Sequence, residues 1–342
     1  MPFVSVIIPC RNEERFIARC LDSVVAQDYP KNKMEVLVVN GMSEDGTRKI
    51  VKRYAKQYSF IKIFDNPKTI TSPALNSGIK NAKGELILWM SAHNRYEREY
   101  ISKCVKYMQE FDAVAVGGII KIIPRNNSFV GKSICLVLSC SFGVGSSIHK
   151  IGTLKPRWVD TAFGTCYRKE VFNRVGLFNE QLVRGQDMEF SIRLKKAGLR
   201  TLLVPDVVSY YYARSDFKSF CRHNFRNGVW AILPLEFTTI MPVSWRHLVP
   251  LAFVSGLVSS LGLWGLWSSL GLMSFLLIIG SYSICNLFLS IKIALREKDW
   301  RYLFIMPVVF ASLHICYGFG SMVGLVRVLF SKNFWKMRFK YK

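Results

Sequence analysis

The stretch that decides the fold opens the chain. Val4-Ser5-Val6-Ile7-Ile8-Pro9 is followed at once by the polar run Cys10-Arg11-Asn12-Glu13-Glu14. The apolar run is short and nearly continuous, as expected for a strand that is buried on both faces of a parallel sheet. Similar apolar runs follow later in the chain, at residues 36–39, 61–64, 86–90 and 113–116. We therefore predict a strand at each of these places.

Helical patterns fill the gaps between these runs. Apolar residues recur every three or four positions from Phe16 to Val25, from Ile50 to Tyr58 and from Tyr100 to Met108. Asn12 and Glu13 give the first helix a polar start, which suits the unpaired N–H groups of a helix N-terminus. Strands that alternate with helices predict a doubly wound α/β sheet.

Polar residues follow three of the predicted strands, in segments 9–14, 40–47 and 91–94. Ligands of doubly wound sheets bind at the carboxyl ends of the strands, so we expect these segments to form one site. The sequence contains no GxGxxG after a strand, no GxxxxGK[ST], no HExxH and no GxSxG. This removes the main sequence support for a dinucleotide site, a P-loop, a zinc protease or an α/β hydrolase.

The composition limits the classes of protein that fit. The chain has 342 residues, is 50% hydrophobic and 20% charged, and carries a net charge of +24. Such a chain is not disordered. Its nine cysteines include no CxxC pair, and their odd number argues against a secreted disulfide framework. The positive excess fits nucleic acid, anionic membrane lipid or a nucleotide diphosphate. Because no nucleic-acid-binding module is recognisable, we expect no nucleic-acid partner.

Two long uncharged stretches predict membrane helices. No Asp, Glu, Lys or Arg occurs from Leu248 to Ile291 or from Tyr302 to Val326, and a spanning helix needs about 20 residues. The first stretch fits two spans that turn near residues 264–269, and the second fits one. A buried pair of core helices is the alternative, which runs of this length disfavour.

The orientation of the last apolar stretch has two explanations. Segment 292–301 is basic, which predicts a cytoplasmic loop. No secretory signal precedes Val4, so we expect a cytoplasmic catalytic domain and a multi-pass protein of the plasma membrane. The tail after Val326 is equally basic, although a third crossing would place it outside. Either the stretch bends back near Gly318 and Gly320, or the tail departs from the positive-inside tendency; we favour three crossings.

Ordered motifs over residues 3–232 resemble those of family 2 glycosyltransferases, which have the GT-A fold. The motifs are VSVIIP (4–9), NEE (12–14), LDSV (21–24), QDYP (27–30), GMSEDGT (41–47), ALNSG (74–78), SAH (91–93), VDTAFG (159–164), VGLFNE (175–180), QDME (186–189) with Arg193, and FRNG (225–228). The likeness is greatest to the membrane-attached succinoglycan glucosyltransferase subgroup. It implies a cytosolic GT-A domain over 1–232. With the uncharged stretches and the basic end of the chain, we further predict an interfacial linker over 233–247, a membrane domain of about three helices over 248–330 and a basic tail over 331–342.

The resemblance also implies inverting transfer from a nucleotide diphosphate sugar. An acceptor hydroxyl attacks the anomeric carbon, and this step needs one carboxylate as a base. Asp187 occupies the family's acidic position, and Arg193 is expected to help keep its carboxylate ionised. The alternative is a solvated helix start where acids suit the helix dipole. The residues expected to bind the nucleotide sugar are Pro9, Arg11, Glu13, Asn40, Ser43, Asn76, Ser91 and Ala92. Those expected to bind an acceptor or a phosphate are Glu189, Arg193, Arg222 and Arg226.

Two positions depart from the family pattern. Most relatives carry Asp at position 40, where Asn40 keeps an acceptor but loses the charge and adds a donor. Relatives also carry Asp at position 91 as a ligand of a divalent metal, and Ser91 weakens such a site because these metals prefer hard oxygen ligands. Mn²⁺ or Mg²⁺ is the expected cofactor, with His93 as its candidate ligand and an ordinary loop histidine as the alternative. Basic residues are candidates to replace part of the metal's charge: Lys150, Arg168, Arg222 and Arg226.

The leading hypothesis is a membrane-bound inverting glycosyltransferase. It moves a hexose from a nucleotide diphosphate sugar to a polyprenyl-linked saccharide, for a surface polysaccharide or a glycolipid. A second hypothesis makes polyprenyl phosphate itself the acceptor, as in dolichol-phosphate mannose synthases. A third is a non-catalytic family member that binds nucleotide or glycan lipid, which the missing acids at positions 40 and 91 motivate.

Overall fold

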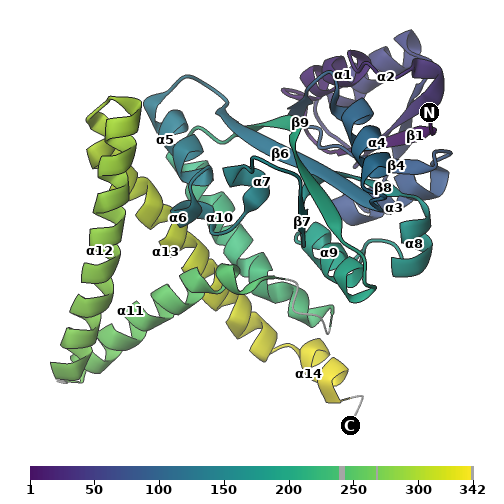
Figure 1. The fold of residues 1–342 in the computed structure, drawn as a ribbon. Coiled ribbons are helices and arrows are strands. Elements are labelled where there is room, and N and C mark those ends of the chain that lie inside the picture. Colours follow the sequence, from purple (N-terminus) through teal and green to yellow (C-terminus); the bar gives the residue numbers. More distant parts are fainter. Residues whose placement is uncertain (239–242, 267–268, 340–342) are drawn as a thin grey trace. The chain divides into compact units, whose positions relative to one another are not determined.

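A computed structural model describes residues 1–238, 243–266 and 269–339 of the chain (Figure 1). The chain forms two compact units. The first contains residues 1–122 and 148–212, and the second contains residues 123–147 and 213–342. The predicted boundary at residue 232 differs from this division, which assigns residues 213–232 to the unit that holds the apolar helices. The functional meaning of the predicted domains stays a prediction.

Four parallel strands form the part of the first unit that the apolar runs predict. They are β1 (Val4–Cys10), β2 (Met34–Asn40), β3 (Ile61–Asp65) and β4 (Leu86–Trp89), in the order β3-β2-β1-β4. The register aligns Cys10 with Asn40 and Asn40 with Asp65, so the carboxyl ends of three strands lie side by side. These predicted strands are confirmed.

The rest of the sheet is not parallel. β8 (Phe163–Arg168) pairs with β4 in the antiparallel direction, and β6 (Ala115–Pro124) pairs in the same way with β8. β9 (Thr201–Ala213) follows β6, and β5 (Asn94–Tyr96) and β7 (Arg157–Val159) are each antiparallel to β9. The described residues therefore form a mixed, nine-stranded sheet, where the sequence predicted a parallel one.

Helices cover both faces of the sheet because strand side chains alternate between two cores. Val4, Val6 and Ile8 belong to a cluster with α1 (Ile17–Val25), α2 (Thr47–Gln57) and α4 (Tyr100–Glu110). Ile7 belongs to a second cluster with α3 (Thr71–Asn81), α8 (Glu170–Val175) and α9 (Gln186–Lys196). Gly78 lets α3 approach β1, since a Cβ atom there would lie 2.4 Å from Ile7 Cγ2. Short helices η1 (Lys31–Lys33) and α7 (Ile148–Ile151) complete this unit.

The second unit is helical. It contains α5 (Phe129–Leu138), α6 (Ser141–Val144), α10 (Phe217–Ile232), α11 (Val249–Gly265), α12 (Ser269–Glu297), α13 (Arg301–Leu329) and α14 (Lys332–Phe339), with the 3₁₀ turns η2 (Leu233–Glu236) and η3 (Trp245–His247). Three helices of the described residues are long and apolar enough to cross a membrane: Trp245–Gly265, Ser269–Glu297 and Arg301–Leu329.

The alternative of a bend near Gly318 and Gly320 does not hold, because α13 is one continuous helix. The two glycines serve close helix packing instead. A Cβ atom at Gly318 would lie 2.3 Å from the carbonyl oxygen of Pro250 in α11, and one at Gly320 would lie 2.0 Å from that of Phe225 in α10. Small residues at these positions let neighbouring helices approach α13 on two sides.

Candidate active site

The loops after β1 and β2 interlock at the carboxyl edge of the sheet. The Asn12 N–H donates to Ser43 Oγ (3.0 Å), and Asn12 Oδ1 accepts from the Glu44 N–H (2.9 Å). The Glu13 N–H donates to Thr47 Oγ1 (2.7 Å). Asn12 has a φ of 54°, a left-handed conformation that Asn tolerates better than most residues. This network fixes the loop backbone that carries Arg11 and Glu13, which follows Pro9 at the end of β1.

Glu13, Ser91 and His93 meet at this edge. His93 Nδ1 lies 2.9 Å from Glu13 Oε1, and His93 Nε2 lies 3.2 Å from Ser91 Oγ. A carboxylate only accepts hydrogen bonds, so Nδ1 carries the proton and the lone pair of a neutral imidazole lies on Nε2. The side chains of His93 and Glu13 are 34% and 21% exposed, so a ligand can reach both.

The side chains around His93 supply only some of the ligands that a metal ion needs. The described residues contain no group of three His, Cys, Asp or Glu side chains that could hold one. A carboxylate on Nδ1 is nevertheless the usual outer partner of a metal-binding histidine, since it orients the ring and makes Nε2 a better ligand. His93 therefore fits as a single protein ligand, with the other ligands left to substrate oxygens and water.

Tyr96 and Tyr211 also belong to this region, and sequence reasoning missed both. The Ser91 N–H donates to Tyr96 Oη (2.6 Å), which fixes the start of the segment that carries His93. The ring of Tyr211 packs edge-on against the His93 ring, with centroids 5.5 Å apart. The run of three tyrosines at 210–212 was the available signal, and it gains meaning only from the pairing of β9 with β5.

Asn40 is fully buried, although the sequence predicted that its side chain contacts the nucleotide. Its exposed fraction is 0%, its Oδ1 accepts from the Ser43 N–H (3.3 Å), and its Nδ2 donates to Asp65 Oδ1 (3.4 Å). Arg48 holds Asp65 through two bonds of 2.8 Å. Asn40 thus supports the 41–47 loop from beneath. An amide suits this place because a second carboxylate would lie against Asp65.

We expect Asn40→Asp to destabilise the fold by about 2 kcal/mol, since it removes a buried donor and places two carboxylates together. The measurement is thermal unfolding of the purified protein, compared with wild type. Adding Asp65→Asn should recover most of the loss, because the second carboxylate is then gone. An Asn40→Asp protein with an unchanged melting temperature would contradict this account of the position.

Two further residues that were predicted to bind the nucleotide sugar are also buried. Asn76 is 3% exposed, and its Nδ2 donates to the Phe178 carbonyl oxygen (2.9 Å) and to Glu180 Oε1 (3.0 Å), while its Oδ1 accepts from the Phe178 N–H (2.9 Å). All of these bonds brace the loop before α9. The side chain of Ala92 is likewise buried at 2% exposure, which leaves only its backbone for a ligand. The predicted binding of the nucleotide sugar by these two residues stays a prediction.

Asp187 lies in the first turn of α9 and is half-buried. Burial raises the pKa of its carboxyl above the ordinary value, although backbone N–H groups of Met188 and of Asp187 itself and the charge of Lys150 act in the opposite direction. A carboxylate that burial makes more basic suits general base chemistry near neutral pH.

Arg193 does not support Asp187, which corrects another prediction. Its guanidinium binds both carboxylate oxygens of Glu189 (2.7 and 2.8 Å) and donates to the carbonyl oxygens of Val175 (2.6 Å) and Leu177 (2.9 Å). Glu189 and Arg193 are four residues apart and share a helix face. These bonds hold α9 against the segment around the end of α8. Because both side chains are used in these bonds, we withdraw the acceptor or phosphate role for Glu189 and Arg193.

The remaining basic candidates lie in different places. Arg168 pairs with Leu86 at the start of β4, at the opposite edge of the sheet from His93, and binds Asp112 (2.6 Å). It is therefore not a candidate for a diphosphate. Arg222 and Arg226 are exposed on α10 in the second unit. Arg11, exposed in the first unit, lies 3.7 Å from Glu44.

The mixed α/β sheet, with polar loops at the ends of β1, β2 and β4, has the arrangement of an enzyme that binds its ligand at the carboxyl ends of the strands. The family model described as glycosyl transferase family 2 matches residues 5–176, and the chain belongs to this family. The protein is a glycosyltransferase.

Relatives match most of the chain. A dolichyl N-acetyl-alpha-D-glucosaminyl phosphate 3-beta-D-2,3-diacetamido-2,3-dideoxy-beta-D-glucuronosyltransferase of Methanococcus voltae is 29% identical over 334 residues, which covers 96% of this chain and 98% of the relative. The succinoglycan biosynthesis protein ExoA of Rhizobium meliloti is 28% identical over 292 residues, with 78% and 86% covered.

A solved structure has the same fold. The mannosyltransferase PcManGT from Pyrobaculum calidifontis, in complex with GDP-Man and Mn²⁺, matches with a TM-score of 0.59 at 20% identity. The match covers 97% of this chain and 88% of that one. The GT-A fold predicted from the motifs is therefore confirmed.

Proposed function

We propose that the protein transfers a hexose from a nucleotide diphosphate sugar to a lipid-linked saccharide, with inversion at the anomeric carbon. The observation that carries the proposal is Asp187, a carboxylate made more basic by burial in a glycosyltransferase chain. It accepts the proton of the acceptor hydroxyl as the hydroxyl oxygen bonds to the anomeric carbon. The bond from that carbon to the diphosphate breaks, and the nucleoside diphosphate leaves.

The donor site in this proposal is the edge built by the loops after β1, β2 and β4. Arg11 and Ser43 lie on the interlocked loops, and Pro9 lies near the end of β1; all three are partly or fully exposed and suited to contact base and ribose. Glu13 and Ser91 contact His93, beside which we place the diphosphate. Asn40 and Asn76 support these loops rather than bind the donor. The backbone of Ala92 is the remaining contact of the SAH motif.

We propose Mn²⁺ or Mg²⁺ as cofactor, with His93 Nε2 as protein ligand and the donor diphosphate and water as the others. The solved complex of PcManGT with GDP-Man and Mn²⁺ supports a metal and a nucleotide sugar of this kind. When bound, the metal offsets the charge of the leaving diphosphate. Glu13 orients the His93 ring, and Ser91 stands where a carboxylate would strengthen the site.

Ser91→Asp is expected to tighten Mn²⁺ binding about 10-fold or more, because it supplies a hard oxygen ligand next to His93. His93→Ala should weaken binding by a similar factor. Calorimetric titration of Mn²⁺ in the presence of a donor nucleotide measures both changes. Ser91→Ala is the matched control and should leave the affinity near that of wild type. Equal affinities in all four proteins would show that the metal, if used, binds elsewhere.

The acceptor is proposed from the rest of the chain. Three helices are apolar enough to cross a membrane, and the relative from Methanococcus voltae is named for a dolichyl-phosphate-linked acceptor. We therefore propose a polyprenyl-linked acceptor, with the catalytic unit on the cytoplasmic side of the plasma membrane. Exposed Arg222 and Arg226, one helical turn apart, are the proposed contacts of its phosphate.

A panel of nucleotide sugars tests the donor. A true donor binds the folded state and raises the melting temperature by mass action, by a few degrees at saturating concentration. Product analysis then separates the two acceptors: an extended lipid-linked saccharide supports the proposal, whereas a sugar monophosphate lipid, which is labile to mild acid, supports a polyprenyl-phosphate glycosyl synthase. No stabilisation by any nucleotide sugar would favour a non-catalytic member that binds glycan lipid.

A further inference from the structure

The membrane path of the last apolar helix can be inferred from the helix packed beside it. α10 and α13 lie side by side within the second unit (Figure 1). Phe220 shares a buried cluster with Phe310, and further along both helices Ser321 Oγ donates to the Gly228 carbonyl oxygen (3.2 Å). Residue numbers rise together along this contact, so the two helices run in parallel. Helices packed in this way lie at the same depth relative to a bilayer.

α10 carries too much exposed charge for the hydrocarbon core. Lys218, Arg222 and Arg226 are exposed and spaced four residues apart, which places them on one stripe of the helix. Asp216 caps its start, and Glu236 lies in the turn that follows its end. Charged side chains inside a bilayer are costly and normally face a protein interior or a water-filled cavity. Exposed as they are, these side chains suit the layer of anionic lipid headgroups.

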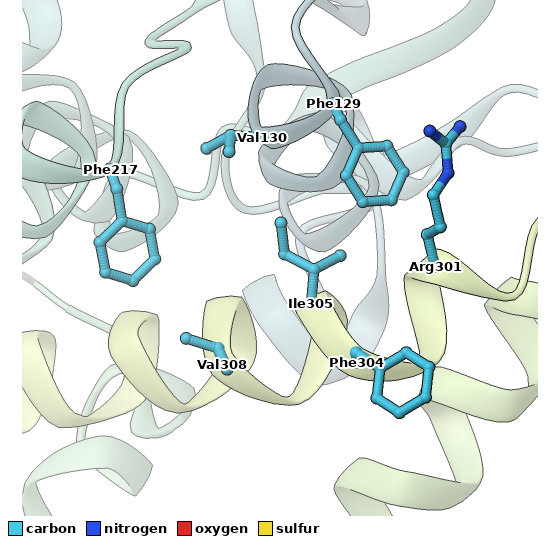
Figure 2. A pocket seen from close by; sticks show the side chains of 7 residues that line it. All are labelled: Phe129, Val130, Phe217, Arg301, Phe304, Ile305 and Val308. Atoms are coloured by element: carbon cyan, nitrogen blue, oxygen red, sulfur yellow. The ribbon is translucent and has the colours of Figure 1, made fainter.

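The other side of α13 is apolar. Five exposed side chains recur at intervals of four and seven residues along the helix: Phe304, Val308, Ile315, Phe319 and Val326. At its first turns this surface continues onto neighbouring helices. Figure 2 shows a groove to which α5 contributes Phe129 and Val130, α10 contributes Phe217, and α13 contributes Phe304, Ile305 and Val308, with Arg301 at the side. Together α5, α10 and α13 therefore form one body with an apolar side and a basic side.

The three apolar helices also differ in how much protein surrounds them. In the most apolar 18 residues of each helix, the buried share is 33% in α13, 11% in the segment that contains α11 and 6% in α12. Low burial is what a helix surrounded by lipid shows. α11 and α12 pack on each other as a hairpin, and each also packs on α13. α13 instead has a protein-facing side along much of its length.

We infer that the α11–α12 hairpin crosses the bilayer while the α10–α13 pair lies along its cytoplasmic surface. The stripe from Phe304 to Val326 faces the acyl chains, and the stripe from Lys218 to Arg226 faces anionic headgroups. The basic tail from Arg327 onward then stays on the same side as the basic segment 292–301. Both segments obey the positive-inside tendency, and the conflict that three crossings create disappears.

Trypsin accessibility of the full-length protein with a C-terminal epitope tag tests this arrangement. The hairpin has no Lys or Arg from Leu248 to Ile291, so trypsin outside the cell finds no site in it. We expect the tag to survive trypsin added to spheroplasts and to be lost when inverted membrane vesicles are treated. Removal of the tag in intact spheroplasts would overturn the inference, because it requires α13 to cross.

Cysteine labelling gives an independent result in a variant whose nine native cysteines are replaced. With a membrane-impermeant maleimide, Leu266→Cys at the hairpin end should react from outside. Lys298→Cys and Ser331→Cys should react only in inverted vesicles. Labelling of positions 298 and 331 from opposite sides would contradict the inference. If this background fails to fold, the trypsin result still decides. Neither readout depends on sugar transfer, so failure of the proposed function leaves the test intact.

Discussion

Asp187→Asn is expected to lower kcat for sugar transfer by at least about 100-fold, because it removes the base that accepts the acceptor proton. Asparagine keeps the size of the side chain, so the donor should still bind and KM for the nucleotide sugar should change little. Steady-state release of nucleoside diphosphate measures both quantities. Asp112→Asn, a change of an exposed acid that pairs with Arg168 at the opposite edge of the sheet, is the control and should keep wild-type rates.

The pH dependence of the wild type adds a second signature. Burial raises the pKa of Asp187, and only the ionised form accepts a proton. As pH falls, kcat should therefore decline at a higher pH than the ordinary aspartate value of about 3.9 would give. A rate that stays flat down to the ordinary value, or an Asp187→Asn enzyme with wild-type turnover, would rule out Asp187 as the base.

The same raised pKa fixes the effect of Asp187 on stability. The folded state favours the protonated carboxyl, so its contribution to stability is present at low pH and is lost as pH rises from the ordinary pKa to the raised one. At pH 7 the ionised side chain opposes folding. The Asn variant should thus melt at the same temperature as wild type or higher, which separates loss of activity from loss of fold.

Glu189→Ala should give the largest loss of stability, about 3 kcal/mol of unfolding free energy. The Glu189 side chain is 4% exposed and that of Arg193 is 21% exposed, and removing one partner of a buried ion pair leaves the other charge uncompensated. Arg193 would keep its bonds to two carbonyl oxygens but lose both to the carboxylate. Thermal or denaturant unfolding of the purified protein measures the loss.

Lys195→Ala is the matched control on the same helix. Its partner Asp160 lies 2.9 Å away, but the two side chains are 61% and 66% exposed, and such pairs contribute less than about 1 kcal/mol. A Glu189→Ala protein with wild-type stability and a reduced kcat would reverse the assignment. It would place Glu189 in contact with substrate instead of in the brace between α9 and the loop before it.

The parts of the fold that could be predicted are those where burial alone shapes the sequence. β1 to β4 are apolar because both faces are covered, and α1, α2 and α4 show the spacing of a one-sided helix. α3 was not predicted as a helix, because Pro73, Asn76 and Gly78 are poor helix formers. Packing on β1 outweighs that propensity. Of the strands with antiparallel partners, only the start of β6 was predicted, at residues 113–116, whereas β5, β7, β8 and β9 were not predicted as strands.

The candidate site shows the same limit: motifs identify its residues, but the sequence does not show which of them contact one another. Residue type and motif bring Glu13, Ser91 and His93 to attention, and the structure places them within hydrogen-bonding distance. The burial of Asn40 was not predicted, because its partner Asp65 lies on the neighbouring strand, which sequence spacing does not reveal. The pairing of Arg193 could have been predicted, since Glu189 is four residues away on one helix face and Asp187 is six residues away.

Transfer of labelled sugar to a lipid-linked acceptor tests the central claim most directly. Full-length protein in detergent is incubated with a divalent metal, a polyprenyl-linked saccharide and the nucleotide sugar that raised its melting temperature. The mass of the lipid product is then measured by mass spectrometry. We predict one added hexose for each nucleoside diphosphate released, and no product with Asp187→Asn. Nucleotide release without any glycosylated lipid, or equal product from both proteins, would contradict the account.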